Sequence, residues 1–319
     1  MSSFQPKNCH TSINTSAVTI SAGEILKDIY AAADALGLVI VGGQAQDVGI
    51  GGYITAGGHS HLNVLYGMAA DQVLEATIVS PSGSILTINA CQNSEYFYAF
   101  RGGGGSTFGV LIDVTVKTYP TPPVTTLTLE IISPTADDTF FEQMAYIMSQ
   151  YPYLSNYSIS AYPYIYPIYP ISATNSVAVY EGVFLLHDGT SGASMTEIFS
   201  PIIEYISSAW PGTYLLNSTT EYPSFYAHFQ ANHDTSAAGT DQFLGSRLLS
   251  ADVLTSNLTA LTAAVKGFTG TLATSGGAPF LLGGKGVKNA VPQGGSDAVL
   301  PAWRSSLVHF GKSSFLVWR

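Results

Sequence analysis

The chain has 319 residues, of which 46% are hydrophobic and only 10% are charged, whereas about 25% charged residues is usual in globular domains. This length supports roughly two domains with buried cores, and so little charge excludes a coiled coil or a disordered polyelectrolyte. With 11 basic and 21 acidic residues the net charge is -10. An acidic chain repels phosphate backbones and anionic lipids, so we expect no nucleic-acid partner. No apolar run reaches the roughly 20 residues of a membrane span, so we expect none.

Signals for cellular location are weak. Residues 1–6 lack the basic start and apolar centre of a secretory signal peptide, so no targeting signal is expected there. Asn-x-Ser/Thr sequons and the low lysine content give a secreted glycoprotein a slight preference. The sequons begin at Asn14, Asn156, Asn217 and Asn257. The two cysteines, Cys9 and Cys91, allow one disulfide or two free thiols, and the sequence leaves that choice open.

The first 120 residues indicate mixed helix and strand. Residues 18–20 predict a short strand, and Ser21 with Glu24 forms a capping-box pattern for a helix that ends at Gly37. The apolar face of this helix is Ile25, Leu26, Ile29, Tyr30, Ala33 and Leu36. Residues 38–41 predict a buried strand.

A hairpin and a further helix follow. Residues 73–79 and 84–88 predict two strands joined at Pro81-Ser82-Gly83. Asn93 or Ser94 then caps a helix through Phe100, and residues 110–117 predict another strand.

The proline-rich run at residues 119–123 indicates a domain boundary. Beyond it we expect strands at 125–131, 159–168 and 177–186, the second of them at a sheet edge because it contains Pro163 and Pro167. Helices are expected after a Thr135 cap, at 194–207, and at 251–266 with Gly267 as the stop. The apolar face of the first of these is Phe140, Phe141, Met144, Ile147 and Met148. The pattern predicts an antiparallel sheet covered by helices on one face, and an α+β protein overall.

Glycine is concentrated at residues 42–58 and 101–109. Such density means either backbone with positive φ or a flat ligand lying against the main chain; two flexible loops are the alternative. A Rossmann fingerprint fails at Ile54, no P-loop occurs, and Leu62 breaks a nucleophile elbow, which weakens a hydrolase reading. His59 and His61 could present two imidazoles to a metal, but no third ligand has recognisable spacing, so no metal is predicted. Tyrosines in residues 162–169 serve either ring stacking or packing.

The order of these motifs resembles the berberine-bridge-enzyme-like branch of the FAD-linked oxidoreductases, with an FAD domain of the p-cresol methylhydroxylase and vanillyl-alcohol oxidase type. The resemblance covers about residues 16–120 and has a fungal character around Cys91. The motifs that carry it are Gly42-Gly43, Val48-Gly49-Ile50-Gly51-Gly52-Tyr53, Gly57-Gly58-His59-Ser60, Tyr66-Gly67-Met68-Ala69-Ala70-Asp71, Pro81-Ser82-Gly83 and Arg101-Gly102-Gly103-Gly104-Gly105-Ser106-Thr107-Phe108-Gly109-Val110.

The resemblance implies that FAD lies against a loop at residues 48–60, where missing side chains admit the flat ring. It also implies that Val48 admits oxygen to the reduced flavin and that the backbone of Gly109 and Val110 holds the adenosine end. Ala45 occupies the position of the family's cysteinyl FAD link and excludes that bond, while the histidyl link would lie upstream of Met1. The residues implied to bind cofactor are Val48, Gly49, Gly51, Gly52, Tyr53, Gly57, Gly58, His59, Ser60, Asp71, Gly109 and Val110.

By the same resemblance, residues 1–120 are the C-terminal part of the FAD-binding domain, residues 121–295 the substrate domain, and residues 296–319 the incomplete start of a segment that returns to the FAD domain. We expect a chain truncated at both ends. The implied function is an oxidase that passes a hydride from a small-molecule alcohol, sugar or amine to flavin and then to oxygen. Tyr164, Tyr166 and His59 have side chains suited to a base, but none is assigned. The alternative is an inactive fragment or a non-catalytic binding protein of this fold.

Overall fold

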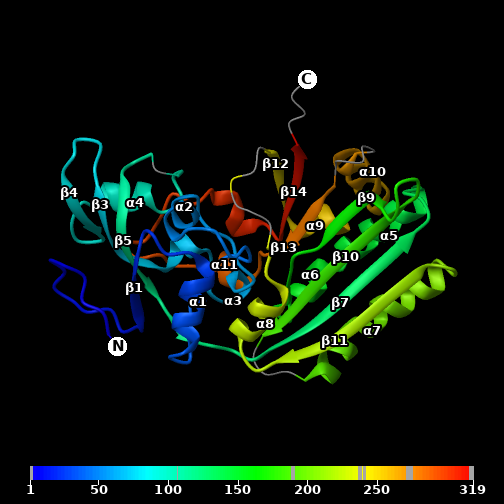
Figure 1. Ribbon diagram of the computed structural model, residues 1–319, viewed down its shortest axis with the longest axis horizontal. Helices are drawn as coiled ribbons and strands as arrows, with labels where there is room; N and C mark the ends of the chain where they lie inside the picture. The colour runs from blue at the N-terminus through cyan, green and yellow to red at the C-terminus, as the bar shows by residue number, and fades with distance from the viewer. Residues whose placement is uncertain are drawn as a thin grey trace. The chain divides into compact units, whose positions relative to one another are not determined.

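The computed structural model describes residues 3–105, 107–187, 191–235, 239, 242–270 and 276–315 (Figure 1). Its contacts divide the chain into two compact units. Unit 1 comprises residues 1–122, 223–238 and 285–304, and unit 2 comprises 123–222, 239–284 and 305–319. Both units are therefore discontinuous in sequence. This division differs from the predicted ranges, because residues 223–238 and 285–295 join unit 1 and residues 305–319 join unit 2.

Unit 1 contains a four-stranded antiparallel sheet in the order β1-β5-β3-β4 and a two-stranded pair, β2-β6. Its strands are β1 (Ala17–Ser21), β2 (Leu38–Val39), β3 (Val73–Val79), β4 (Ile85–Asn89), β5 (Val110–Lys117) and β6 (Tyr119–Pro120). Its helices are α1 (Leu26–Asp34), α2 (Ile50–Thr55), α3 (Asn63–Tyr66), η1 (Ala69–Gln72), α4 (Ser94–Phe100), α8 (Phe225–Asn232), α11 (Lys285–Lys288) and η2 (Pro301–Ser305). The predicted hairpin at residues 73–88 is confirmed as β3 paired with β4.

The first helix is shorter than the sequence indicates. Ser21 pairs with Asp113 as the last residue of β1 and lies too far before Leu26, the first helical residue, to cap the helix. The helix begins at Leu26 after an extended Ile25 that makes no side-chain cap, and the predicted capping box is wrong. Leu36, predicted on the buried face, lies beyond the helix and is 74% exposed. The predicted strand at residues 38–41 is reduced to Leu38–Val39.

The structure resolves the choice for the two cysteines. Cys9 and Cys91 form a disulfide with their Cα atoms 5.4 Å apart. Nearby, the Asn8 side chain donates to Gln92 Oε1 at 2.6 Å, and the Lys7 N–H donates to Glu75 Oε2 at 2.7 Å. The N-terminal segment is thereby fastened to the hairpin and to the turn before α4.

Unit 2 is built on an eight-stranded antiparallel sheet in the order β11-β7-β10-β8-β13-β14-β12, with β9 also paired to β10. Its strands are β7 (Val124–Ser133), β8 (Ser160–Ala161), β9 (Tyr164–Pro170), β10 (Ser176–His187), β11 (Tyr214–Tyr222), β12 (Gln242–Leu249), β13 (Ala278–Leu281) and β14 (Val308–Phe315). Its helices are α5 (Asp138–Ser149), α6 (Tyr151–Ser155), α7 (Gly192–Ala209), α9 (Ala251–Thr255) and α10 (Leu258–Thr269).

One apolar cluster holds unit 2 together. Buried residues of all five helices join alternate residues of the central strands, among them Phe184 of β10 and Phe199 of α7 with ring centroids 4.9 Å apart. The strands alternate buried and partly exposed positions, so the helices cover one face of the sheet. The predicted α+β class, with a helix-covered antiparallel sheet after the proline-rich boundary, is confirmed.

Several predicted details of unit 2 are wrong. Residues 159–168 form two strands, β8 and β9, broken at Tyr162-Pro163, and β8 lies between β10 and β13 instead of at an edge. Pro167 is tolerated because the β9–β10 register shifts beside it. The cap of α5 is Asp137, which accepts from the Phe140 N–H. The helix predicted at 251–266 is two helices, and Gly270, not Gly267, ends the second.

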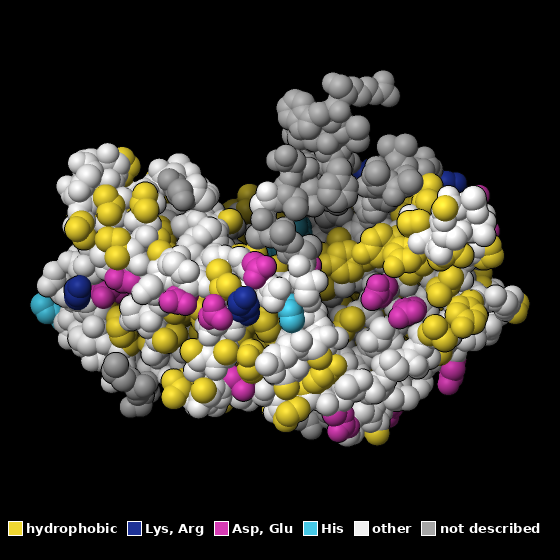
Figure 2. Space-filling model, in the orientation of Figure 1, with side chains coloured by type: hydrophobic (Ala, Val, Ile, Leu, Met, Phe, Trp, Pro, Cys, Tyr) yellow, Lys and Arg dark blue, Asp and Glu magenta, His cyan; other side chains and the backbone are white. Residues whose placement is uncertain are grey.

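Across the described residues, no helix combines the length and apolarity that a membrane crossing requires. On the face seen in Figure 2, charged side chains are sparse and are scattered among uncharged ones.

Candidate functional site

The first glycine-rich stretch forms a helix and a turn. Residues predicted as a loop fold into α2, which contains Gly51 and Gly52 and follows the extended Gly49. Directly after it, Gly57 and Gly58 adopt φ of 101° and 64°, a region in which a side chain is strained. The expected loop is thus a short helix that ends in a double-glycine turn.

Packing inside unit 1 explains Gly58. A methyl group added there would lie 2.7 Å from both Ala69 Cβ and the ring of Tyr53. The Tyr53 hydroxyl donates to the carbonyl of His59 at 2.9 Å, so this side chain holds the turn closed. The Ser60 hydroxyl is buried and accepts from the Leu62 N–H at 3.1 Å. Tyr53 and Ser60 therefore shape the turn from within.

The second glycine-rich stretch lies against the first. The Gly104 N–H donates to the Thr55 carbonyl at the end of α2, at 2.9 Å. Gly109 has a φ of 155°, and a methyl group there would lie 2.9 Å from the Val79 carbonyl oxygen. Ser106 of the predicted motif falls outside the described residues. In the described part, both stretches are hydrogen-bonded parts of unit 1, so the alternative of two loose linkers does not hold.

Packing within unit 1 does not explain why two other positions are glycine. Gly52 is exposed, and a methyl group added there would meet nothing within 4 Å. Gly105 is also exposed, and the nearest neighbour of its added methyl would be Thr55 Oγ1 at 4.0 Å. A glycine inside a helix costs about 1 kcal/mol relative to alanine. The bare backbone at Gly52 leaves space for a flat group to lie against α2.

Three other predicted residues border α2. Val48 is half-buried, and its carbonyl accepts from the Leu26 N–H at 3.0 Å. Gly49 bridges to Ile25. Val110, 64% exposed, begins β5, and the next residue, Leu111, would lie 3.4 Å from a methyl group at Gly51. The structure thus brings the Val48–Ser60 residues and the start of β5 into one region of unit 1.

Asp71 belongs to a charge cluster formed with Arg304 and Asp297. Its two oxygens accept from Arg304 Nη1 at 2.8 Å and Nη2 at 2.7 Å, and Oδ2 also accepts from the Met68 N–H at 2.7 Å. Arg304 Nη2 donates to Asp297 Oδ1 as well, at 3.1 Å. Burial, together with the hydrogen bond and charge of Asp71, raises the pKa of Asp297 to about 7.

Arg101 is fully buried in unit 1, whereas Arg304 is half-buried. Arg101 is 1% exposed and stacks over the Phe97 ring, with Cζ 3.8 Å from the ring centroid. Its Nη2 donates to the Ser296 carbonyl at 2.6 Å, and its own carbonyl accepts from the Ala298 N–H at 2.9 Å. Burial lowers its pKa to about 10, against the opposing charges of Asp297 and Asp71.

Sequence reasoning missed this cluster as part of the site. Arg304 and Asp297 lie more than 200 residues from Asp71, and nothing local to them signals a partner. The composition gave one weak signal. Because the chain has only 11 basic residues, few are available to pair with a buried carboxylate.

His59 and His61, the two histidines considered as metal ligands, do not belong to a metal-binding cluster among the described residues. His61 and His228 are buried with ring centroids 5.6 Å apart in an edge-on contact, and His59 is half-buried. Within the described ranges, no group of three His, Cys, Asp or Glu side chains is arranged to hold a metal ion.

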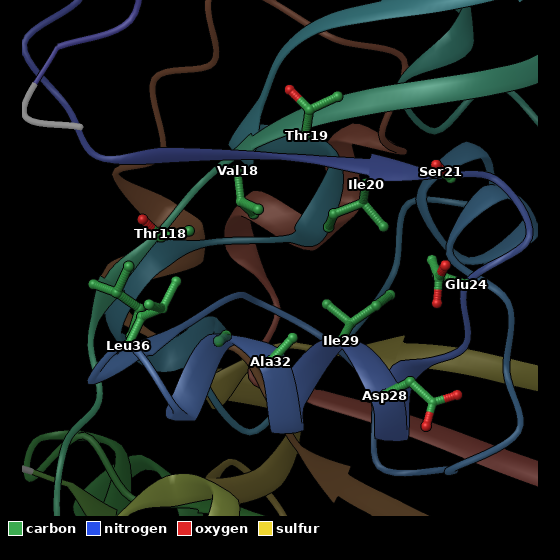
Figure 3. A pocket seen from close by; sticks show the side chains of 12 residues that line it. Val18, Thr19, Ile20, Ser21, Glu24, Asp28, Ile29, Ala32, Leu36 and Thr118 are labelled. Carbon is green, nitrogen blue, oxygen red and sulfur yellow. The ribbon is translucent and has the colours of Figure 1, made fainter.

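A cavity of about 360 Å³ lies between β1 and α1 of unit 1 (Figure 3). Val18 and Ile20 point from the strand toward Ile29 and Ala32 of the helix. None of the residues predicted to bind cofactor lines it. This apolar hollow is separate from the glycine surface.

An aromatic cluster gathers on unit 2. Tyr164 and Tyr166 stack with ring centroids 6.0 Å apart, and Phe280 lies 5.5 Å from Tyr164 and 4.6 Å from Tyr162. Tyr164, Tyr166 and Phe280 are half-buried, so they line the sheet face opposite the apolar cluster.

Comparison with known proteins shows that the chain is similar to FAD-linked oxidoreductases. Residues 7–89 match a family described as an FAD binding domain. The FAD-linked oxidoreductase patO of Aspergillus clavatus is 34% identical over 298 residues, which cover 91% of this chain and 48% of patO. The FAD-linked oxidoreductase apf9 of Gibberella fujikuroi is 32% identical, over 92% of this chain and 51% of apf9.

Solved structures share the fold. The VAO-type flavoprotein MtVAO713 from Myceliophthora thermophila superposes with a TM-score of 0.84 at 25% identity, over 99% of this chain and 56% of that one. Berberine bridge enzyme from Eschscholzia californica superposes with a TM-score of 0.68 at 17% identity, over 94% of this chain and 58% of that one.

Residues 7–89 are therefore similar to an FAD-binding domain, and the chain has the fold of the VAO-type flavoproteins. More narrowly, it is homologous to fungal FAD-linked oxidoreductases and shares its fold with the berberine-bridge-enzyme-like branch, which confirms the resemblance given by the motifs. The chain spans about half the length of the curated relatives it matches.

Proposed function

We propose that the chain is part of an FAD-dependent oxidoreductase whose flavin rests on the bare backbone of unit 1. The observation that carries the proposal is the exposed Gly52 in α2, with the Gly57-Gly58 turn behind it and Gly105 alongside. FAD would supply the hydride-accepting chemistry when bound. Unit 1 would then be the FAD-binding domain and unit 2 the substrate domain.

Different residues of unit 1 would have different roles in binding FAD. Gly52 and Gly105 would contact the flavin ring through their backbone, while Tyr53 and Ser60 would stabilise the turn from Gly57 to His59. Backbone at Gly109 and Val110 would hold the adenosine end. Asp71 would act indirectly, since both its oxygens are engaged by Arg304. Ala45 offers no sulfur for a cysteinyl link.

We infer a small-molecule substrate that gives up a hydride from a C–H bond beside a hydroxyl or an amine. The aromatic cluster of unit 2 suits a ring-bearing substrate such as a sugar or an aromatic alcohol. A general base must take the hydroxyl or amine proton. Tyr164, Tyr166 and His59 have suitable chemistry, and none of them is assigned that role.

The test of cofactor binding is direct. The purified protein is expected to show the flavin absorbance bands, or to acquire them when titrated with FAD and passed through a desalting column. Riboflavin, which lacks the pyrophosphate and adenosine, is the control ligand. Protein that stays colourless with FAD under these conditions would support the alternative, a non-catalytic protein that retains the fold.

Oxygen is proposed as the electron acceptor on the identity of Val48. Replacing it by leucine should narrow the approach to the flavin, so Val48→Leu is expected to slow reoxidation by air at least tenfold. The flavoprotein would be reduced with dithionite and mixed with aerated buffer, while reoxidation by ferricyanide, which takes electrons at a distance, serves as control. Equal rates in air for both proteins would remove the case for an oxidase.

The secretory pathway is proposed as the location. All four sequon asparagines, Asn14, Asn156, Asn217 and Asn257, are exposed and could accept glycans.

A further inference from the structure

Residues 294–304 touch both glycine-rich stretches of unit 1. At one end, the carbonyl of Ser296 and the N–H of Ala298 bond to Arg101, which opens the second stretch. At the other end, Arg304 bonds both oxygens of Asp71. We call residues 294–304 the strap.

Val299 is the centre of the strap. A methyl group added at Gly102 would lie 2.9 Å from its Cγ2 atom, and one added at Gly57 would lie 3.9 Å from the same atom. Val299 is 5% exposed and packs with Met68, Ala70 and Val287 in a small apolar cluster. The two glycine stretches therefore converge on one side chain of the strap.

A short chain of hydrogen bonds connects Arg304 to the double-glycine turn. Arg304 fixes the Asp71 carboxylate, which in turn accepts from the Met68 N–H and so fixes the start of η1. The next two amides, of Ala69 and Ala70, donate to the carbonyls of Gly58 and Gly57, each at 3.0 Å. Each link in this chain is a direct contact.

We propose that the strap is a positioning element for the FAD surface, with Arg304 and Val299 as the residues that hold the Gly57-Gly58 turn in its binding shape. The proposal rests on the proposed function in one respect, the identity of the ligand. Losing Arg304 leaves Asp71 buried without its bidentate partner, so η1 and the turn it supports should loosen together.

The test combines two measurements on Arg304→Met. Hydrogen–deuterium exchange of the apoprotein, followed in peptides covering residues 53–62 and 66–74, is expected to speed up at least tenfold in both, with β7 unchanged. The FAD dissociation constant is expected to rise at least tenfold. Lys266→Met is the matched control, because it removes an ion pair of the same 2.7 Å length, to Asp138 on the surface of unit 2. It should change neither quantity.

The outcomes separate the two proposals. Unchanged exchange in both peptides of Arg304→Met would overturn the strap, and so would wild-type-like FAD affinity in that variant. If the wild-type chain binds no FAD, the proposed function fails, and the exchange comparison alone decides the strap. Should Arg304→Met not fold, Arg304→Lys replaces it, since lysine keeps the charge but cannot bond both carboxylate oxygens. An exchange increase of at least threefold is then expected, and no increase would overturn the strap.

Discussion

Gly52 and Gly58 are glycines for different physical reasons. Gly58 is forced by its neighbours and its φ, whereas Gly52 has regular helical backbone and open space around it. Gly52→Ala is expected to stabilise the protein by about 0.5–1 kcal/mol, because alanine is the better helix former. Gly52→Leu is expected to weaken FAD binding at least tenfold, because its side chain occupies the surface on which we place the ring.

Chemical denaturation and FAD titration of the two variants measure these effects. Gly23→Ala is the control, since a methyl group there also meets nothing within 4 Å but lies outside the proposed site. Full FAD affinity in Gly52→Leu would show that α2 is not the surface the flavin uses.

Asp297 makes the stability of unit 1 depend on pH. Its folded pKa is raised to about 7, mainly by burial, whereas an unfolded aspartate titrates near 3.9. The folded state therefore holds this proton more tightly, and the stability it contributes is full below about pH 4 and lost as the pH rises to about 7. Arg304, Asp71 and Arg101 are the charged groups that face it.

Asp297→Asn removes that titration. The difference in unfolding free energy between wild type and Asp297→Asn should change across the pH range from about 4 to 7, by at most about 1.4 kcal/mol per pH unit. Wild type should lose stability relative to the variant as the pH rises. Urea denaturation at several pH values measures the difference, and parallel curves would contradict the raised pKa.

At the scale of elements, the disulfide fastens a segment that has little secondary structure. It closes a loop between positions 82 residues apart, for which loss of the crosslink costs about 2–4 kcal/mol. The double variant Cys9→Ser with Cys91→Ser is expected to unfold at lower temperature than wild type. Reductant should lower the wild-type midpoint toward that of the variant and leave the variant unchanged; an equal midpoint for both proteins without reductant would contradict a stabilising bridge.

Local pattern predicted elements well where one physical cause dominated. The β3–β4 hairpin follows from its turn residues, and the apolar face of α5 follows from its period, with Phe140, Phe141 and Met144 all buried. Pattern failed where tertiary pairing competed with local signals. Ser21 is used by the sheet instead of the helix. β8 pairs with both β10 and β13, and β9 pairs with β10 despite Pro167.

The candidate site shows the same limit. Motif order led to the glycine stretches, because a bare backbone is visible in the sequence. The resemblance implied a return segment from residue 296, which overlaps the strap. Motif order could not give the strap's contacts, since those of Asp71 with Arg304 and of Gly102 with Val299 join positions that only the fold brings together. Local sequence also gave no sign that residues 49–55 would be helical, because their glycines disfavour a helix.

At the scale of the whole molecule, unit 1 is made of three separate stretches of the chain, 1–122, 223–238 and 285–304. Tyr30 packs on Phe229 of α8 with ring centroids 4.7 Å apart, and Asp71 needs Arg304. Breaking a buried ion pair by removing one partner costs about 3–5 kcal/mol, a large part of the 5–15 kcal/mol that typically stabilises a domain. Residues 1–122 alone are therefore expected to lack a cooperative thermal transition. A chain that joins residues 1–122, 223–238 and 285–304 through Gly-Ser linkers should regain one by circular dichroism, because it restores both partners. A sharp transition in the 1–122 piece would mean that α8 and the strap are dispensable for folding. The three stretches of unit 1 would then contact one another without forming one cooperative folding unit.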